Sequence, residues 1–274
     1  MNLLKLMQSK TYNIRISFTF AARYKPNSIT IYMKKIILLS ILSVFAFQSK
    51  GEVWFDVGAK GAYAPGVFTN PYILSSENQR LAYNHGYFVG GKIGINFGLT
   101  HSATIDVLYS TTTQTLINND KTNNYTVSLS SIDLPIMYRN NGDNGSYGEI
   151  GPQLSFTRKA QADLNGVSQD AKNSFNSTNM GVAFGFGQYI GGGNVFGLTM
   201  GLRFAYSFGD IVASSSQHLT GDPVFQPLGP DETSTYTYKA SGRLYAGVVV
   251  EANFNIGYIT QGSRCSKRTK FKMF

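Results

Sequence analysis

Histidine, serine and aspartate side chains offer the clearest chances for chemistry in this 274-residue chain, which contains three histidines: His85, His101 and His218. A hydrolase needs a nucleophile, a base and an orienting acid that meet at one place. Two neighbourhoods could supply part of such a group, namely His85 near Ser75 and Ser76, and His218 near Asp222. Neither is a complete triad, so we expect exposed loop histidines and no enzyme.

Metal and nucleotide sites have little support in the sequence. The single cysteine, Cys265, cannot build a Cys/His zinc motif, and a chain with one cysteine has no disulfide framework. The glycine-rich stretches at 142–146 and 191–194 predict tight turns, because no helical pattern follows them as a phosphate-binding loop would require. We therefore expect no metal and no cofactor.

The net charge of +9 belongs to the two ends of the chain. Residues 1–50 contain eight Lys or Arg and residues 259–274 contain five, with no acidic residue in either segment. The body, 52–258, carries 11 basic and 15 acidic residues and is mildly acidic. A basic surface for nucleic acid is not expected in such a body.

Seven charged residues of the body alternate with apolar neighbours: Asp56, Lys60, Lys92, Asp106, Glu149, Arg203 and Glu251. Alternation with a period of two places successive side chains on opposite faces of a β-strand. The clearest example is 198–208, where six apolar residues alternate with small or polar ones. The same pattern predicts eight strands, at 53–60, 89–97, 104–110, 125–138, 149–156, 182–187, 198–208 and 243–256. The fourth strand changes phase, which predicts a β-bulge at Ser130–Ser131.

The connections between these strands alternate in length. Long connections fall at 66–86, 111–124, 157–179 and 209–242, and short ones at 98–102, 139–146 and 188–195. Outer-membrane barrels have this arrangement, whereas a soluble lipocalin-like barrel has no reason for it and would turn its apolar face inward. We predict an all-β fold, an eight-stranded antiparallel up-and-down transmembrane β-barrel.

The seven charged residues must then line the interior, because a lysine or arginine facing lipid at mid-depth costs about 2–4 kcal/mol. An eight-stranded barrel has an interior that its own side chains fill. We therefore expect the acidic and basic groups to pair across a plugged lumen.

The segments outside the body have other expected roles. Met33-Lys34-Lys35 followed by an apolar run predicts a signal peptide at 33–51, with cleavage before Glu52. Residues 1–32 then form a mis-called extension; a long leader or amphipathic anchor is the alternative. The barrel occupies 52–258, and 259–274 forms a basic C-terminal tail.

The stretches VWFDVGAKGAY, ATIDVLYS, SLSSIDLPIMYR, YGEIGPQLSF, NMGVAFGFG and GLRFAYSFGDI resemble successive strands of the PorT-like outer-membrane β-barrel family. The parts of this chain that are most specific to the resemblance are Asp133-Leu134-Pro135 leading into Tyr138, and Gly151-Pro152. The resemblance implies an eight-stranded membrane barrel. One member of that family belongs to a protein-secretion and gliding apparatus, which makes such an apparatus a candidate partner.

From these observations we expect a bacterial outer-membrane protein with a structural or envelope-interaction role. Its expected partners are outer-membrane lipid and envelope or secretion-apparatus proteins, and not nucleic acid. The long connections 157–179 and 209–242 are the expected contact sites, since polar loops on a rigid scaffold often bind partners. A narrow transport pore and a loop-borne lipid or peptide hydrolase are the alternatives.

Overall fold

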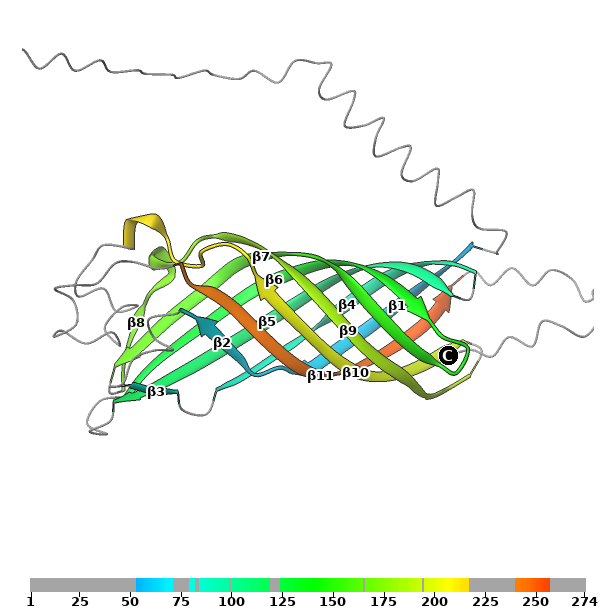
Figure 1. The fold of residues 1–274 in the computed structure, drawn as a ribbon, viewed down its shortest axis with the longest axis horizontal. Coiled ribbons are helices and arrows are strands. Elements are labelled where there is room, and N and C mark those ends of the chain that lie inside the picture. Colours follow the sequence, from blue (N-terminus) through cyan, green and yellow to red (C-terminus); the bar gives the residue numbers. More distant parts are fainter. Residues whose placement is uncertain are drawn as a thin grey trace, which may run out of the picture. The chain divides into compact units, whose positions relative to one another are not determined.

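The chain forms a closed antiparallel ring of eight long strands (Figure 1), as the alternation predicted. The computed structural model describes residues 53–70, 79–81, 84–98, 100–118, 124–164, 166–193, 195–216 and 240–256. In ring order, the strands are β1 (Val53–Tyr63), β4 (His85–Phe97), β5 (His101–Asn118), β6 (Asn124–Asn141), β7 (Ser146–Leu164), β9 (Thr178–Gly192), β10 (Phe196–Ser207) and β11 (Gly242–Ile256). Strand β11 pairs with β1 and closes the ring.

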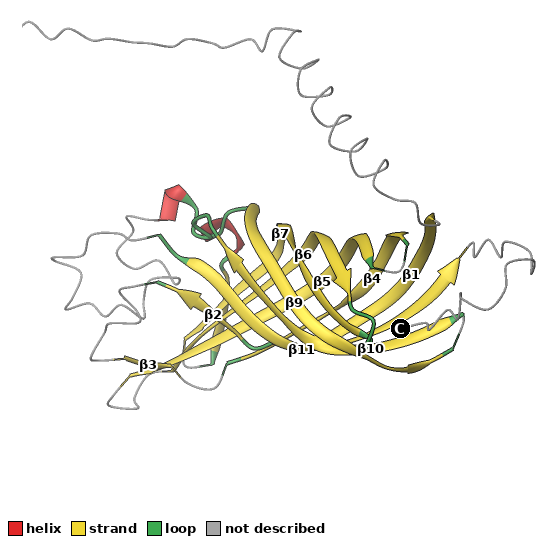
Figure 2. Cartoon of the chain, turned by 45° about the vertical axis from the view of Figure 1, so that its right-hand side comes forward, coloured by secondary structure: helices red, strands yellow, loops and turns green. Residues whose placement is uncertain are grey.

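The two ends of the barrel differ. At one end, which we call the turn end, short connections at 98–100, 142–145 and 193–195 join the strands. At the other, the loop end, lie three short strands and two 3-10 turns (Figure 2): β2 (Gly66–Thr69), β3 (Gln79–Leu81), β8 (Val167–Asp170), η1 (Lys172–Ser174) and η2 (Ser214–Ser216). In the described part of the chain, no helix has the length and apolar character to cross a membrane.

The predicted long connections 66–86, 157–179 and 209–242 fall at the loop end and the predicted short ones at the turn end, but parts of the predicted loops are strands. Strand β5 continues to Asn118 and β6 begins at Asn124, so the predicted loop 111–124 is mostly sheet. The predicted loop 157–179 contains the end of β7, all of β8 and η1. Within 209–242, residues 217–239 lie outside the described residues, as do the predicted extension, signal peptide and tail.

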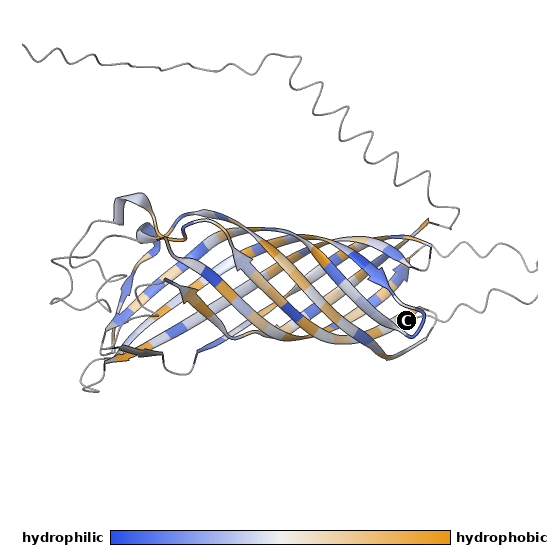
Figure 3. Cartoon of the chain, in the orientation of Figure 1, coloured by the Kyte–Doolittle hydropathy of each residue, from blue (hydrophilic) through white to orange (hydrophobic). Residues whose placement is uncertain are grey.

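The outer face of the barrel is apolar through its middle. Ile93, Ile105 and Ile150 are each more than half exposed, whereas inward-facing Arg203 is 1% exposed. Apolar and polar residues alternate along each strand, as the bands of colour in Figure 3 show. Leu202 is 39% exposed and its neighbour Arg203 is buried, so the predicted assignment of faces is confirmed.

Between the apolar band and the loop end, the outer face of β5 and β6 becomes polar and the inner face becomes apolar. Outward-facing Thr113 and Ser128 share a hydrogen bond of 2.9 Å between their hydroxyl oxygens, while Val127 and Leu129 are buried inside. Side chains of β6 keep one phase along the whole strand. The environment outside the sheet therefore changes, and the direction of the side chains does not.

This exchange corrects the predicted β-bulge. The irregularity opposite Ser130–Ser131 lies in β7: Ser130 pairs with Lys159 and Ser131 with Thr157, which leaves Arg158 as the extra residue. The sequence showed apolar residues one step out of phase in β6, and we read this as an insertion there. It instead reflects a change from an apolar outer face to an apolar inner face.

Candidate functional site

The charged interior near the turn end is the first candidate site. Eight side chains from seven strands meet there, and we call them the turn-side charge network: Asp56, Lys60, Lys92, Asp106, Arg139, Glu149, Arg203 and Glu251. Each is at most 6% exposed. The strand pairing explains their meeting, because Lys60 lies opposite Glu251 across β1–β11 and Arg139 opposite Glu149 across β6–β7.

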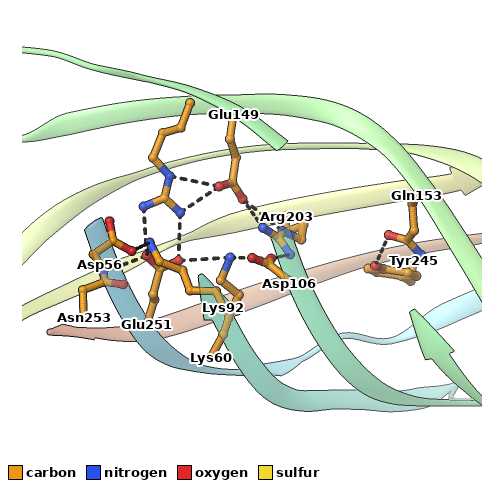
Figure 4. Close-up of polar contacts among 11 residues, drawn as sticks. Asp56, Lys60, Lys92, Asp106, Glu149, Gln153, Arg203, Tyr245, Glu251 and Asn253 are labelled. Carbon is orange, nitrogen blue, oxygen red and sulfur yellow. Dashed lines mark hydrogen bonds and ion pairs between the residues drawn. The ribbon is translucent and has the colours of Figure 1, made fainter. Parts of the chain in front are cut away.

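Glu251 is the centre of this network (Figure 4). Its Oε1 lies 2.7 Å from Lys92 Nζ, and its Oε2 lies 3.1 Å from Lys60 Nζ and 2.8 Å from Arg139 Nη2. Asn253 Nδ2 also donates a hydrogen bond of 2.7 Å to Glu251 Oε1. One carboxylate thus joins cations from β1, β4 and β6 inside the barrel.

The remaining contacts make the network continuous. Arg203 donates to Asp106 Oδ2 at 2.9 Å and also pairs with Glu149. Lys60 Nζ lies 2.7 Å from Asp106 Oδ2, and Arg139 Nη2 lies 2.7 Å from Glu149 Oε2. Each carboxylate of these pairs therefore contacts a cation from another strand, which fixes the strands relative to one another.

The network is electrically balanced, with four cationic and four anionic side chains. Balance matters because an unpaired charge taken out of water costs several kcal/mol. All seven residues singled out in the sequence lie in this network, but Arg139 was missed. It follows Tyr138, which faces outward and is 42% exposed, so the alternation of faces along the strand contained the signal.

Small inward-facing residues make room for these long side chains. A Cβ atom on Gly94 would lie 2.6 Å from Asp56 Oδ1, closer than two such atoms approach. At Gly151 the restriction comes from the backbone, because a Cβ there would lie 1.8 Å from the carbonyl oxygen of Ile136. The narrow interior thus depends on glycine beside the charged groups.

A second ion pair lies further toward the loop end. Arg243 Nη2 is 3.0 Å from Asp133 Oδ2, and Arg243 Nη1 donates 2.8 Å to Ser131 Oγ. Sequence reasoning did not select this pair, although both residues occupy the polar phase of their strands. An apolar layer separates it from the turn-side charge network: Ala64, Phe88, Leu108, Met137, Ala183, Ala205, Tyr245 and Val249. Interior polar and apolar layers therefore alternate along the barrel.

An apolar cap fills the loop end. Its buried side chains are Phe68, Leu116, Tyr125, Val127, Leu129, Ala160, Ala162, Ala171, Phe175, Ile211 and Val212. Residues 171–176 and 210–213 are tied together by a β-bridge between Phe175 and Val212, and by Asn176 Nδ2, which donates to the Asp210 carbonyl at 2.7 Å. The predicted loops 157–179 and 209–242 thus contribute packed structure to the cap.

The histidine neighbourhoods do not assemble among the described residues. His101 lies at the turn end, where its Nδ1 shares a hydrogen bond of 2.8 Å with Tyr138 Oη. His85 is exposed at the start of β4, and Ser75, Ser76, His218 and Asp222 lie outside the described residues. The described residues contain no group of three or more His, Cys, Asp or Glu side chains suited to a metal ion.

Comparison with known proteins adds a family and a set of similar folds. Residues 48–213 match the family described as outer membrane protein beta-barrel domain. Among solved structures, neisserial surface protein A is 16% identical, with 73% of this chain and 97% of that chain covered and a TM-score of 0.38. OprG from Pseudomonas aeruginosa is 9% identical, with 75% and 98% covered and a TM-score of 0.40.

A third similar structure is Ail, the attachment invasion locus protein of Yersinia pestis, solved in complex with the heparin analogue sucrose octasulfate. It is 10% identical, covers 73% of this chain and 99% of its own, and has a TM-score of 0.34. No curated protein matches the sequence.

Proposed function

The chain belongs to the outer membrane protein β-barrel family and lies in the bacterial outer membrane, and from this premise we propose that it is a plugged, non-enzymatic barrel that presents its loop end to a partner in the cell envelope. The observation that carries the proposal is the filled interior. The turn-side charge network, an apolar layer, a second ion pair and the apolar cap follow one another along the lumen.

A filled lumen supports a role other than transport. A passing ion would have to separate contacts such as Lys92 to Glu251 at 2.7 Å and then cross a layer that contains Leu108 and Met137, both 0% exposed. Separation of a buried ion pair costs about 3–5 kcal/mol when one partner is left uncompensated. The interior thus has the character of a protein core and not of an aqueous channel.

Planar-bilayer recording tests this part of the proposal. Refolded full-length protein should leave the conductance at the background level over the range of applied voltage that a bilayer tolerates. A general-diffusion porin reconstituted in the same way serves as the positive control. Discrete, reproducible openings of the wild-type protein would contradict the proposal and favour the narrow pore.

The loop end is the part of the molecule that we propose to contact a partner. In barrels of this class, the short turns lie in the periplasm and the longer connections lie outside the cell. The apolar cap and the β7–β8 hairpin would therefore lie on the extracellular side of the membrane. Exposed side chains on that hairpin include Val167, 63% exposed. The packed cap offers a defined surface, and a preformed surface lowers the entropy cost of binding.

Photo-crosslinking in living cells tests the contact. A photoreactive amino acid at Val167, at the loop end, should give a discrete protein adduct. The same amino acid at Asn144, in an exposed turn at the opposite end, is the control. Adducts from Asn144 alone would contradict the proposed orientation or the proposed binding end.

The resemblance to PorT-like barrels extends the proposal to a specific kind of partner, a component of a protein-secretion apparatus. Its most specific segment includes Asp133, which holds Arg243 inside the barrel. That segment therefore supports the stability of the barrel, and partner contact is left to the loop end. Deletion of the gene should lower the amount of protein exported by that apparatus, and unchanged export would refute this extension.

A further inference from the structure

A pair of basic residues lies at the edge of the apolar band on β7. Going toward the loop end, the outward-facing residues of this strand are Ile150, Pro152, Leu154 and Phe156, followed by Arg158 and Lys159. The same edge passes between Ile132 and Ser130 on β6, since Ile132 pairs with Phe156 and Ser130 with Lys159. Arg158 and Lys159 thus begin the first polar row above the band.

The β-bulge places both side chains on the outer face. In a regular strand, two consecutive residues point to opposite faces, so one of the pair would point into the barrel. Because Arg158 is the extra residue of the bulge, Arg158 and Lys159 are both exposed, while Thr157 and Ala160 on either side are buried. A bulge of this kind re-aims side chains, and here it brings two positive charges side by side.

These two charges have no acidic partner in the described structure. Arg158 and Lys159 form no ion pair with any described residue, although every inward-facing Lys and Arg of the strands is paired. Among the outward-facing strand side chains that the structure describes, no other residue is a lysine or an arginine. Asp163, an acidic outward-facing residue on the same strand, lies four residues beyond Lys159 toward the loop end. It accepts a hydrogen bond of 2.8 Å from the backbone N–H of Gly166.

We propose that Arg158 and Lys159 form a binding site for the phosphate of a glycolipid headgroup in the outer leaflet. The apolar residues below them contact the acyl chains of the same lipid, so a headgroup phosphate lies at the height of the basic row. Arginine binds phosphate through paired N–H donors, and lysine adds a second point charge. On β6 and β5 the polar row continues with Ser130, which is 9% exposed and pairs with Lys159, and with Thr111, whose hydroxyl oxygen lies 3.2 Å from that of Ser130.

The inference rests on the orientation given under the proposed function, in which the loop end faces outside. It does not rest on a closed lumen or on a protein partner. A lipid-binding measurement in detergent is therefore independent of bilayer conductance and of crosslinking in cells, and the two proposals can fail separately.

Native mass spectrometry of the full-length protein in detergent tests the site. The probes are a phosphorylated lipid A, the same lipid without its phosphates, and inorganic phosphate. We expect the wild-type protein to retain the phosphorylated lipid in preference to the dephosphorylated one, and millimolar inorganic phosphate to leave the bound lipid in place. Equal retention of the two lipids, or displacement by inorganic phosphate, would overturn the assignment to a glycolipid headgroup.

Three variants locate the site. The double variant Arg158→Gln/Lys159→Gln should weaken binding of the phosphorylated lipid roughly tenfold or more, and Arg158→Lys/Lys159→Arg, which keeps both charges, should retain most of it. Lys172→Gln removes an exposed charge from η1, beyond the band, and serves as the matched control with unchanged binding. Heat-modified migration on a gel confirms that each variant is folded. Unchanged lipid binding by the folded Gln/Gln variant would refute the site.

Discussion

Replacement of Glu251 by glutamine removes the centre of the turn-side charge network while leaving its shape nearly the same. Three cations lie 2.7–3.1 Å from this carboxylate, and the side chain is 1% exposed. In Glu251→Gln the network would hold four cations and three anions, and Lys92 would keep only Asp56, at 3.3 Å. Loss of one partner from a buried ion pair costs about 3–5 kcal/mol. Total stabilities are about 5–15 kcal/mol, so the variant should fold with a much smaller margin.

Urea unfolding of refolded protein in lipid vesicles measures this change. Trp54, the one tryptophan of the chain, lies in β1 at the turn end and gives a fluorescence signal close to the substitution. Asp143→Asn removes the same charge from an exposed turn and should change the free energy of unfolding by less than about 0.5 kcal/mol. A Glu251→Gln value as small as that of the control would refute the reasoning.

A double substitution separates charge imbalance from lost packing. Lys60→Met in the Glu251→Gln background returns the network to three cations and three anions. Because the two side chains are in contact, their effects should not add, and the double variant should be less destabilised than the sum of the single variants. Strict additivity would mean that the ion pair of 3.1 Å contributes no coupling.

Two further predictions concern close packing and the lipid-facing surface. Gly151→Ala should prevent formation of the heat-modifiable folded band, because the new Cβ would lie 1.8 Å from the Ile136 carbonyl oxygen, whereas Gly148→Ala, with no atom within 4 Å, should fold normally. Equal folding of the two glycine variants would contradict the close approach of β6 and β7. Ile105→Lys, on the exposed apolar band, should lower the free energy of unfolding in vesicles by about 2–4 kcal/mol. Ser128→Lys, on the loop-end side of the band, should cost less than about 0.5 kcal/mol in the same titration. Equal costs for the two lysine variants would contradict the position of the edge of the apolar band.

Strand number and the direction of most side chains were predictable because both follow from a local pattern. A period of two is visible in each strand alone, as between Leu202 and Arg203, and it needs no knowledge of which strands pair. The interior position of Glu251 follows in the same way. Sequence reasoning could therefore state which charged groups face the lumen, although it overlooked Arg139.

Contacts between strands were not predictable, since they depend on register and on the stagger of the closed barrel. Nothing local indicates that Glu251 contacts Lys60, Lys92 and Arg139 from three different strands. The location of the β-bulge failed for a related reason. A change of apolar face has the same signature as an inserted residue, and only the pairing of Lys159 with Ser130 separates the two.

Alternate residues of each strand face lipid and a packed interior, and quenching by brominated lipid tests this arrangement most directly. In a Cys265→Ser background, single cysteines at Leu202, Phe204 and Ala205 are labelled in the unfolded state with a small fluorophore, and the protein is refolded into vesicles. Leu202 is 39% exposed and Ala205 is 3% exposed. We expect strong quenching at 202 and 204 and little at 205. Strong quenching at 205 with protection at 202 and 204 would contradict this arrangement.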